Sequence, residues 1–576
     1  MASPPGGKTV PNPLLPSFPG NGAQRGADAF VDTLIRLGVK DAFNVIGLGM
    51  YPLGDAFHRR RGEIRYISHV NETNLALVAQ GYARARRRPA CAIVYYSSGT
   101  SLAMIGLTVA WADRIPLVLV STTNSRRSSG RDQYAAVPRS ILEMGAQYTK
   151  WSYEVPTADR IPEALARAFA IAAQPPMGPV HLAIPSDLLG DVFDETPPRA
   201  DFDRTVTYAH ATADEAGLAA AATLLAGARQ PVLLFGSEVG QYDDAIAPAV
   251  SLAEALGAPV LIDDQPAYLG FPTTHANYIG KLKTQRQLLA AADVVLSVGM
   301  EFTQIGVPGE PPPLPPAATL IALSVDPALP VRQVWPDLAL TGHPQASLAR
   351  LDALVRERIE AATCARNQTA TDALRAARLR AADVVRAIPW DRPSVLRSAL
   401  IDVVHQQYGA DWIVVDALTS AVTHFDALYE LTDPRAYHGL SGKGSAQGWG
   451  APSAIGVQIA SPGKRVVCLL GDGNLMFTSS SIYLAGKMKL PMVFVLVNNG
   501  GWAHIRGAMA GQVYDDDDLR AMGWLFDVDY CALAQTFGLR SARATTAAEL
   551  AAALAVSAAT DEPWLIDTVT EGDDPR

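Results

Sequence analysis

Short apolar runs alternate with segments of helical periodicity along nearly the whole chain. Such runs predict buried strands, because the segments between them place apolar residues every three or four positions, as amphipathic helices do. The expected strands fall into three groups: 42–45, 91–95, 117–121 and 180–184; 232–235, 259–262, 294–298 and 319–324; and 412–415, 466–470, 493–497 and 564–568. Strands that alternate with helices form parallel sheets, so the pattern predicts three parallel-sheet α/β domains.

Changes in composition divide the chain between these groups. Residues 188–212 gain acids and a Pro-Pro pair, which is typical of a linker, and residues 356–390 are charged and helix-forming without a strand pattern. Residues 307–316 are rich in proline and predict a loop. The predicted organisation is a flexible N-terminal segment over 1–24, a first domain over 25–190, a central domain over 210–355 and a third domain over 394–576.

Composition excludes several classes of function. The formal net charge of -9 offers no basic surface for nucleic acid. No stretch reaches the roughly 18 to 20 consecutive apolar residues that a membrane span requires. The four cysteines have no paired ligand spacing, so we expect reduced thiols and a cytoplasmic protein. They are Cys91, Cys364, Cys468 and Cys531.

Two expected strands of the third domain end in residues suited to a metal ion and a phosphate group. Residues 466–470 run into Gly471-Asp472-Gly473, and residues 492–497 run into Asn498-Asn499-Gly500-Gly501. The glycines permit sharp turns and a close approach of the backbone to a ligand. One carboxylate and one amide oxygen suit Mg²⁺, which a diphosphate would help to coordinate. The alternative is a structural Asx turn at Asp472. Residues 477–489, between the two motifs, read as one crossover helix.

The first domain offers a glutamate at the start of a predicted helix. Glu72 closes the segment His69-Val70-Asn71-Glu72, and Gly81-Tyr82-Ala83-Arg84 follows after a short interval. Taken alone, Glu72 would be an N-terminal charge favoured by the helix dipole. Its spacing from the second segment, together with the motifs of the third domain, favours a functional role.

These motifs together resemble the thiamine diphosphate (ThDP) signature of the superfamily that contains pyruvate decarboxylase, acetolactate synthase and benzoylformate decarboxylase. The resemblance covers the chain after about residue 24 and names the domains as pyrimidine-binding, central Rossmann-like and diphosphate-binding. It implies Mg²⁺ coordination by Asp472, Asn499 and the carbonyl of Gly501. It also implies that the diphosphate is held by Gly471, Gly473 and Asn474.

The same resemblance gives Glu72 its role. ThDP reacts through a deprotonated ring carbon, and its aminopyrimidine removes that proton once a carboxyl group engages the opposite ring nitrogen. Glu72 is expected to supply this carboxyl group. Enzymes of this superfamily place the cofactor between two chains, with Glu72 from one and Asp472 from the other. A homodimer or homotetramer is therefore expected.

Some positions depart from the family pattern. The serine and two histidines that benzoylformate decarboxylase uses around its substrate match Leu48, Tyr95 and Gly306, so benzoylformate is not the expected substrate. Gln447 stands where the family has a bulky apolar residue under the cofactor. A buried amide needs a partner, so Gln447 is expected to contact cofactor or substrate. The carbonyl of Ser445 can still accept from the aminopyrimidine amine.

His504 is a third departure, because the resembling enzymes carry a small or apolar residue there. We hypothesise that His504 acts as an acid or base or contacts substrate; the alternative is an exposed loop histidine. Further pocket candidates are His69, Tyr95, Tyr96 and Gln133. The central domain has no GxGxxG fingerprint, which makes FAD unexpected and disfavours a dinucleotide-dependent dehydrogenase.

The expected activity is C–C bond chemistry next to a carbonyl group in a small 2-oxo acid or ketone. With the decarboxylase histidines missing, carboligation of a 2-oxo acid donor, as in acetolactate synthase, is the first choice. Decarboxylation to an aldehyde and C–C hydrolysis of a dione are the alternatives. A catalytically silent regulatory paralogue is the non-enzyme alternative, although the presence of Glu72, Asp472 and Asn499 argues against it.

Overall fold

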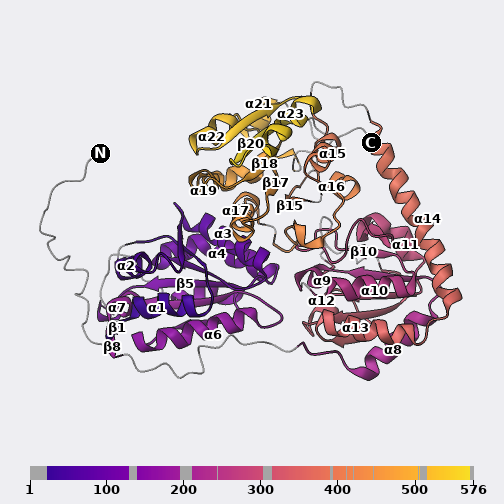
Figure 1. Cartoon of the computed structure of the whole chain (residues 1–576), viewed down its shortest axis with the longest axis horizontal. Helices are drawn as coiled ribbons and strands as arrows, with labels where there is room; N and C mark the ends of the chain where they lie inside the picture. The colour runs from indigo at the N-terminus through magenta and orange to yellow at the C-terminus, as the bar shows by residue number, and fades with distance from the viewer. Residues whose placement is uncertain are drawn as a thin grey trace, which may run out of the picture. The chain divides into compact units, whose positions relative to one another are not determined.

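The computed structural model divides the chain into two compact units, Met1–Thr207 and Tyr208–Arg576, and each is described by itself. Figure 1 shows the elements of both, coloured along the chain. Among the residues that the structure describes, no helix is both long and apolar enough to cross a membrane. The described residues are 23–47, 49–128, 139–194, 210–242, 244–302, 314–388, 394–409, 411–419, 421–444, 446–503, 505 and 516–570.

The first unit is built on a six-stranded sheet in the order β3-β2-β4-β5-β7-β6. Every neighbouring pair in this sheet is parallel. Parallel strands buried on both faces read as continuous apolar runs, which is why the sequence predicted the interior strands. The strands are β2 (Asp41–Asn44), β3 (Arg65–Ser68), β4 (Ala90–Val94), β5 (Leu117–Thr123), β6 (Trp151–Glu154) and β7 (Val180–Pro185).

Helices cover both faces of this sheet (Figure 1). One face packs Val118, Val120 and other alternate strand residues into an apolar cluster with its helices. Those helices are α1 (Gly26–Arg36), α2 (Tyr51–Arg59), α6 (Ile161–Ala173) and α7 (Ser186–Gly190). The intervening residues of β5 and β7, including Ser121 and His181, face the second set. That set is α3 (Glu72–Arg86), α4 (Tyr96–Ala112) and α5 (Ile141–Gly145).

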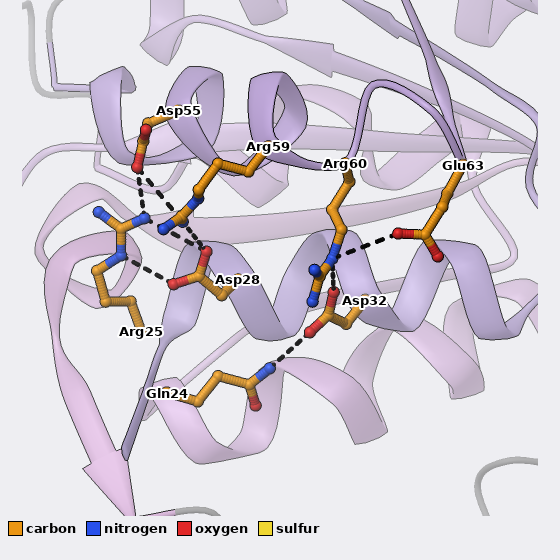
Figure 2. Close-up of polar contacts among 8 residues, drawn as sticks. All are labelled: Gln24, Arg25, Asp28, Asp32, Asp55, Arg59, Arg60 and Glu63. Carbon is orange, nitrogen blue, oxygen red and sulfur yellow. Dashed lines mark hydrogen bonds and ion pairs between the residues drawn. The ribbon is translucent and has the colours of Figure 1, made fainter. Parts of the chain in front are cut away.

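A buried arginine joins the first elements of this unit. Arg25 closes β1 (Ala23–Arg25), which pairs antiparallel with β8 (Val192–Asp194). Its guanidinium group donates to Asp28 of α1 over 2.8 Å and to Asp55 of α2 over 2.6 Å (Figure 2). These two carboxylates offset the cost of burying the Arg25 charge. The network therefore holds β1, α1 and α2 together.

The second unit contains two sheets, of which the first belongs to the central part of the chain. Its strands are all parallel, in the order β11-β10-β9-β12-β13-β14. This is the doubly wound order of Rossmann folds, in which the strand order reverses between β9 and β12. The strands are β9 (Pro231–Phe235), β10 (Val260–Ile262), β11 (Tyr278–Lys281), β12 (Val294–Val298), β13 (Thr319–Ser324) and β14 (Leu338–Thr341).

The second sheet of this unit lies in the C-terminal part of the chain, after the long helix α14 (Ala361–Arg386). Its order is β16-β15-β17-β18-β20-β19, again with every pair parallel. The strands β17 and β18 are neighbours, so their carboxyl ends lie at one edge. The strands are β15 (Ile413–Ala417), β16 (Tyr437–His438), β17 (Val466–Gly471), β18 (Met492–Asn498), β19 (Arg540–Ala544) and β20 (Trp564–Val569).

The crossover between β17 and β18 corrects one prediction. A single helix over 477–489 was expected, but the structure has α18 (Asp472–Phe477), a 3-10 turn (Ser479–Ser481) and α19 (Ile482–Met488). Thr478 interrupts the helix, because its hydroxyl group donates to the Gly448 carbonyl over 2.6 Å and its backbone leaves helical geometry. Threonine and serine side chains compete with helical hydrogen bonds in this way.

Candidate functional site

The carboxylate of Asp472 connects the ends of β17 and β18. Asp472 begins α18 directly after β17, and its side chain is buried. Its Oδ1 accepts from the Gly473 backbone N–H over 2.8 Å. Its Oδ2 accepts from the Gly501 backbone N–H, also over 2.8 Å. A carboxylate oxygen can accept from more than one partner, so a cation could bind beside these two donors.

The two asparagines after β18 play different parts. The Asn498 side chain accepts from the Gly500 backbone N–H over 3.1 Å and donates to Asp567 of β20 over 2.7 Å. Asn498 therefore shapes the turn. The Asn499 side chain instead lines a cavity that Asp472 and Gly501 also line.

This cavity has a volume of about 230 Å³ at the carboxyl edge of the sheet. It brings together nearly all the site residues that the sequence predicted for the third domain. The predicted residues that line it are Gln447, Gly471, Asp472, Gly473, Asn474, Asn499 and Gly501. Ser445 and His504 lie outside the described residues, as do Leu48, Gln133 and Gly306.

Glycine positions give the cavity the form of a cradle for a phosphate group. A Cβ atom on Gly471 would meet nothing within 4 Å, so the backbone there faces open space. A Cβ on Gly473 would overlap the Trp502 ring, and a Cβ on Gly501 would overlap the Trp524 carbonyl. Gly501 also has a φ of 141°, which side chains rarely tolerate. The sequence reasoning missed Trp502, whose ring backs the Gly473 turn.

The donor set fits a magnesium diphosphate. One buried carboxylate, one amide oxygen and a backbone carbonyl are hard oxygen ligands, and Mg²⁺ is usually held by one or two protein carboxylates together with phosphate oxygens and water. Among the described residues, no group of three or more His, Cys, Asp and Glu side chains could hold a metal ion unaided.

Gln447 occupies an exposed position in the single chain. Its Oε1 accepts from the Asn474 side chain over 3.3 Å. Gln447 and Asn474 also line a second cavity of about 500 Å³, between the C-terminal sheet and residues 264–284 of the central sheet. The solvated Gln447 amide needs no protein partner, so it is available to a ligand in either cavity.

In the first unit, Glu72 begins α3 beside the first turn of α4. The side chain of Asn71 caps the helix by accepting from the Asn74 backbone N–H over 2.8 Å. Glu72 is half-buried, and this burial raises the pKa of its carboxyl group above the ordinary value of 4.5. A Cβ on Gly99 of α4 would lie 2.7 Å from the Glu72 Oε1, so only glycine leaves room for the carboxyl group. Sequence reasoning missed Gly99.

Two tyrosine rings lie near the start of α4. Tyr95 and Tyr96 stack with ring centroids 4.2 Å apart. A Cβ on Gly47 would overlap the Tyr95 ring, and a Cβ on Gly49 would lie 2.7 Å from the Tyr96 hydroxyl. Gly47 therefore packs directly on the Tyr95 ring and Gly49 on the Tyr96 hydroxyl group. His69, the remaining candidate, is buried and accepts from the Val70 backbone N–H over 2.8 Å.

An acidic side chain lies at the carboxyl edge of the central sheet, beside the turns that follow β9 and β12. Glu238 accepts from the Val325 backbone N–H over 2.6 Å and from the Ser324 hydroxyl group over 2.7 Å. Burial raises the pKa of the nearby Asp263 carboxyl group to about 7. A nucleotide bound here would compete with Glu238 for these donors.

Comparison with known proteins agrees with this geometry. Three family models match: the N-terminal TPP binding domain of thiamine pyrophosphate enzymes over residues 24–144, their central domain over 218–351, and their C-terminal TPP binding domain over 419–568. Thiamine pyrophosphate is another name for ThDP.

Curated relatives match over nearly their full length. The chain is 30% identical to benzoylformate decarboxylase of Pseudomonas aeruginosa, covering 89% of this chain and 93% of the relative. It is 26% identical to the acetolactate synthase isozyme 2 large subunit of Escherichia coli, covering 94% of each.

A solved structure shows the same architecture. The crystal structure of a thiamin diphosphate-dependent enzyme from Mycobacterium smegmatis matches with a TM-score of 0.78 at 26% identity, covering 95% of this chain and 99% of that one. The three α/β domains, the glycine-lined strand ends and these matches lead to one assignment. The chain belongs to the superfamily of thiamine diphosphate-dependent enzymes that includes benzoylformate decarboxylase and acetolactate synthase.

Proposed function

We propose that this protein uses ThDP and Mg²⁺ to make or break a C–C bond next to a carbonyl group. The observation that carries the proposal is the buried Asp472 carboxylate, held by two backbone donors within the 230 Å³ cavity that Asn499 also lines. When bound, ThDP supplies a carbon nucleophile for a substrate carbonyl group.

The residues at the two strand ends divide the binding between them. Asp472, the Asn499 side chain and the Gly501 carbonyl would hold Mg²⁺. The Gly501 carbonyl already accepts from the Ala503 backbone N–H over 3.0 Å and has a second lone pair for the cation. The turn of Gly471, Gly473 and Asn474 would hold the diphosphate, because the backbone at Gly471 faces open space and α18 begins there.

Glu72 would move a proton at the aminopyrimidine ring. A carboxyl group whose pKa is raised by burial shares a proton with a weakly basic ring nitrogen more readily than an ordinary carboxylate does. The absence of a side chain at Gly99 supports this role, since it leaves the carboxyl group its space.

Carboligation of a 2-oxo acid donor is the reaction that we favour. In place of the serine and two histidines of benzoylformate decarboxylase, this chain has Leu48, Tyr95 and Gly306. None of these matches the proton-handling groups that would help release an aldehyde. The loss of these three groups is the sequence difference that favours carboligation over release of an aldehyde. The similarity to benzoylformate decarboxylase favours decarboxylation as the second candidate.

His504 is the proposed acid–base or substrate-contacting residue beyond Glu72. Its position after Asn499 in the sequence supports the proposal, since Gly501 and Trp502 between them line the cavity. Unchanged turnover in a His504→Ala variant would remove His504 from the reaction.

Two further parts of the proposal concern the molecule as a whole. We propose a homodimer or homotetramer in which the site is completed by a second copy of the chain, as the family resemblance implies. We also propose the cytoplasm as its location, supported by the four free cysteines in the described residues.

A product assay tests the reaction. Purified protein with ThDP and Mg²⁺ is incubated with pyruvate, with and without an acceptor aldehyde, and Asp472→Ala is the control. A ligated hydroxyketone that appears only with intact protein supports carboligation. Free aldehyde without ligated product would establish decarboxylation instead. Failure of the intact protein to bind ThDP in a calorimetric titration would favour a silent paralogue.

A further inference from the structure

The turn between β4 and α4 has a backbone conformation that needs support. Tyr96, the first residue of α4, has a φ of 46° in the left-handed region. Aromatic residues rarely adopt this conformation, and they keep it only where the surroundings impose it. The residue before it, Tyr95, makes no side-chain cap to the helix. Other groups must therefore hold this turn.

A chain of buried polar groups ends on the carbonyl of Tyr96. The Thr100 Oγ1 lies 2.7 Å from that carbonyl oxygen and 2.7 Å from the Ser121 Oγ. The Ser121 Oγ lies 2.8 Å from the His181 Nε2. Thr100, Ser121 and His181 are all fully buried, and they come from α4, β5 and β7.

The His181 Nδ1, unpartnered among the described residues, favours one direction for this series of hydrogen bonds. Thr100 has one hydroxyl proton and lies within hydrogen-bond distance of both the Tyr96 carbonyl and the Ser121 hydroxyl group. If the proton goes to the Tyr96 carbonyl, Ser121 donates to Thr100 and the His181 Nε2–H donates to Ser121. The opposite direction would leave the Tyr96 carbonyl without this donor. It would also place a proton on the His181 Nδ1, which has no hydrogen-bond partner among the described residues. Buried donors without partners are rarer than buried acceptors without partners.

His181 is suited to a fixed donor role. Its burial lowers the pKa of the imidazole to about 4, so the ring stays neutral near pH 7. The Nδ1 faces Gly145 at the end of α5, where a Cβ would lie 3.2 Å away. The imidazole ring therefore lies between Gly145, beside Nδ1, and Ser121, which is within hydrogen-bond distance of Nε2.

The backbone turn at Tyr96 positions the start of α4, which lies beside Glu72. The Gly99 backbone N–H donates to the Tyr95 carbonyl over 2.9 Å, which makes Gly99 part of the first turn of α4. Gly99 is the residue that leaves room for the Glu72 carboxyl group. About two helical turns further along α4, a Cβ on Gly106 would lie 2.5 Å from the Ala76 Cβ, so α3 and α4 are closely packed there.

We infer that His181 is a positioning residue for Glu72. It acts through Ser121 and Thr100 to hold the left-handed turn at Tyr96, and that turn fixes the helix against which the Glu72 carboxyl group rests. The effect of this positioning on activity rests on the proposed function of Glu72. Its effect on the titration of the Glu72 carboxyl group does not, because that titration can be measured in protein without cofactor.

The test uses three variants and one control in the full chain. His181→Leu removes the donor at similar volume, whereas His181→Gln places an amide N–H near the Nε2 position. Thr100→Val removes the hydroxyl group at the other end of this series of hydrogen bonds, and it tests the same inference if His181→Leu does not fold. Thr33→Val is the control, because Thr33 is buried on α1, across the sheet, and among the described residues its hydroxyl group bonds only within that helix, donating to the Ala29 carbonyl and accepting from Arg36.

Two measurements are made on each protein. Carbodiimide labelling of Glu72 in cofactor-free protein, followed by mass spectrometry across pH, reports the protonation of that carboxyl group. The pH profile of kcat/KM reports the working enzyme. We expect His181→Leu and Thr100→Val to move the labelling midpoint to lower pH, because a loosened turn admits water to Glu72. We expect the acid limb of the pH profile to move the same way.

The remaining proteins separate positioning from general stability. His181→Gln should have a labelling midpoint close to that of the wild-type protein. Thr33→Val should lower the melting temperature and leave the labelling midpoint unchanged. Equal midpoints in wild-type, His181→Leu and Thr100→Val proteins would overturn the inference, as would no difference between His181→Gln and His181→Leu. If the variants shift the labelling midpoint as expected but the wild-type protein does not bind ThDP, the proposed function fails and the positioning role stands.

Discussion

The backbone N–H of Gly501 donates a hydrogen bond of 2.8 Å to the Asp472 Oδ2 across 29 residues of chain. With the second bond from Gly473 to Oδ1, it fixes the plane of the carboxylate at the edge where β17 and β18 end. Fixed orientation of a ligand by such donors strengthens metal binding. The pairing of β17 and β18 in the C-terminal sheet therefore sets the orientation of the carboxylate at the proposed Mg²⁺ site.

Removing the Asp472 carboxylate should abolish tight cofactor binding. Asp472→Ala is expected to weaken the affinity for ThDP with Mg²⁺ by at least about 100-fold, since loss of groups that merely orient a ligand costs 10- to 100-fold. Calorimetric titration measures the change. Asp527→Asn is the matched control, because Asp527 is exposed in the same part of the chain and pairs with Arg520. Equal affinity in Asp472→Ala and wild-type protein would place the metal elsewhere.

A side chain at Gly501 should damage both folding and binding. In Gly501→Ala, the new Cβ would overlap the Trp524 carbonyl at a φ of 141°, so the loop must move. We expect a loss of at least about 2 kcal/mol in the free energy of unfolding. Gly463→Ala, where a Cβ meets nothing within 4 Å, should be nearly neutral. Denaturant unfolding compares the two, and equal stabilities would show that the loop adapts freely.

Burial of Glu72 should make stability depend on pH in a particular direction. The folded protein keeps the Glu72 proton to higher pH than the unfolded chain, which releases it near 4.5. Its contribution to stability is therefore lost as pH rises from about 4.5 through the raised pKa. Glu72→Gln should remove this loss and raise the melting temperature near pH 7. It should also lower kcat by about 100-fold or more.

The control for this prediction is Glu63→Gln, because the Glu63 side chain is 58% exposed. Melting temperatures of the three proteins across pH give the comparison. A Glu72→Gln protein that is less stable than wild type near pH 7 would show that the carboxylate is favourably bound rather than desolvated.

Mixing two inactive variants should restore activity if the site lies between chains. In a mixed dimer of Glu72→Gln and Asp472→Ala, one site carries both changes and the other carries neither. Random mixing then restores up to about a quarter of the wild-type activity. Activity of the mixture after refolding or subunit exchange, compared with each variant alone, is the measurement. No recovery in a confirmed mixed dimer would place both residues in one chain.

The purified protein is expected to carry no FAD. The Glu238 carboxylate accepts from the hydroxyl group of Ser324 and the backbone N–H of Val325, at the carboxyl end of β13. Asp263 and Glu301 line a small cavity at the same edge of the sheet, where a dinucleotide would place its phosphates. Absorption in the flavin band and chromatography of the heat-released ligand test this expectation. Stoichiometric flavin would show that Glu238 gives way to the nucleotide.

The strands that could be predicted from the sequence are those inside the sheets. β4, β5, β17 and β18 are buried on both faces and read as continuous apolar runs. The strands that the sequence did not reveal are the sheet edges, which are short and interrupted by polar or small residues, so they form no continuous apolar run. They are β3, β6, β11, β14, β16 and β19, together with the small pair β1 and β8.

The site shows the same division. The motif from Gly471 to Gly473, the pair Asn498 and Asn499, and Glu72 could be found from the sequence, because each stands at the end of a recognisable strand or the start of a helix. The sequence also determined the superfamily. Only the tertiary structure decided that Asn498 shapes the turn and donates to Asp567, and that Gln447 is exposed in the single chain.

The contacts behind these residues also required the folded chain. Trp502 behind Gly473, Gly99 beside Glu72, and His181 at the end of a hydrogen-bonded chain join segments far apart in the sequence. Hydrophobic pattern and turn residues act locally, so the sequence by itself determined the sheets and the cofactor motifs. Side-chain packing between distant segments has no local pattern, so the surroundings of each site residue were decided only when the chain folded.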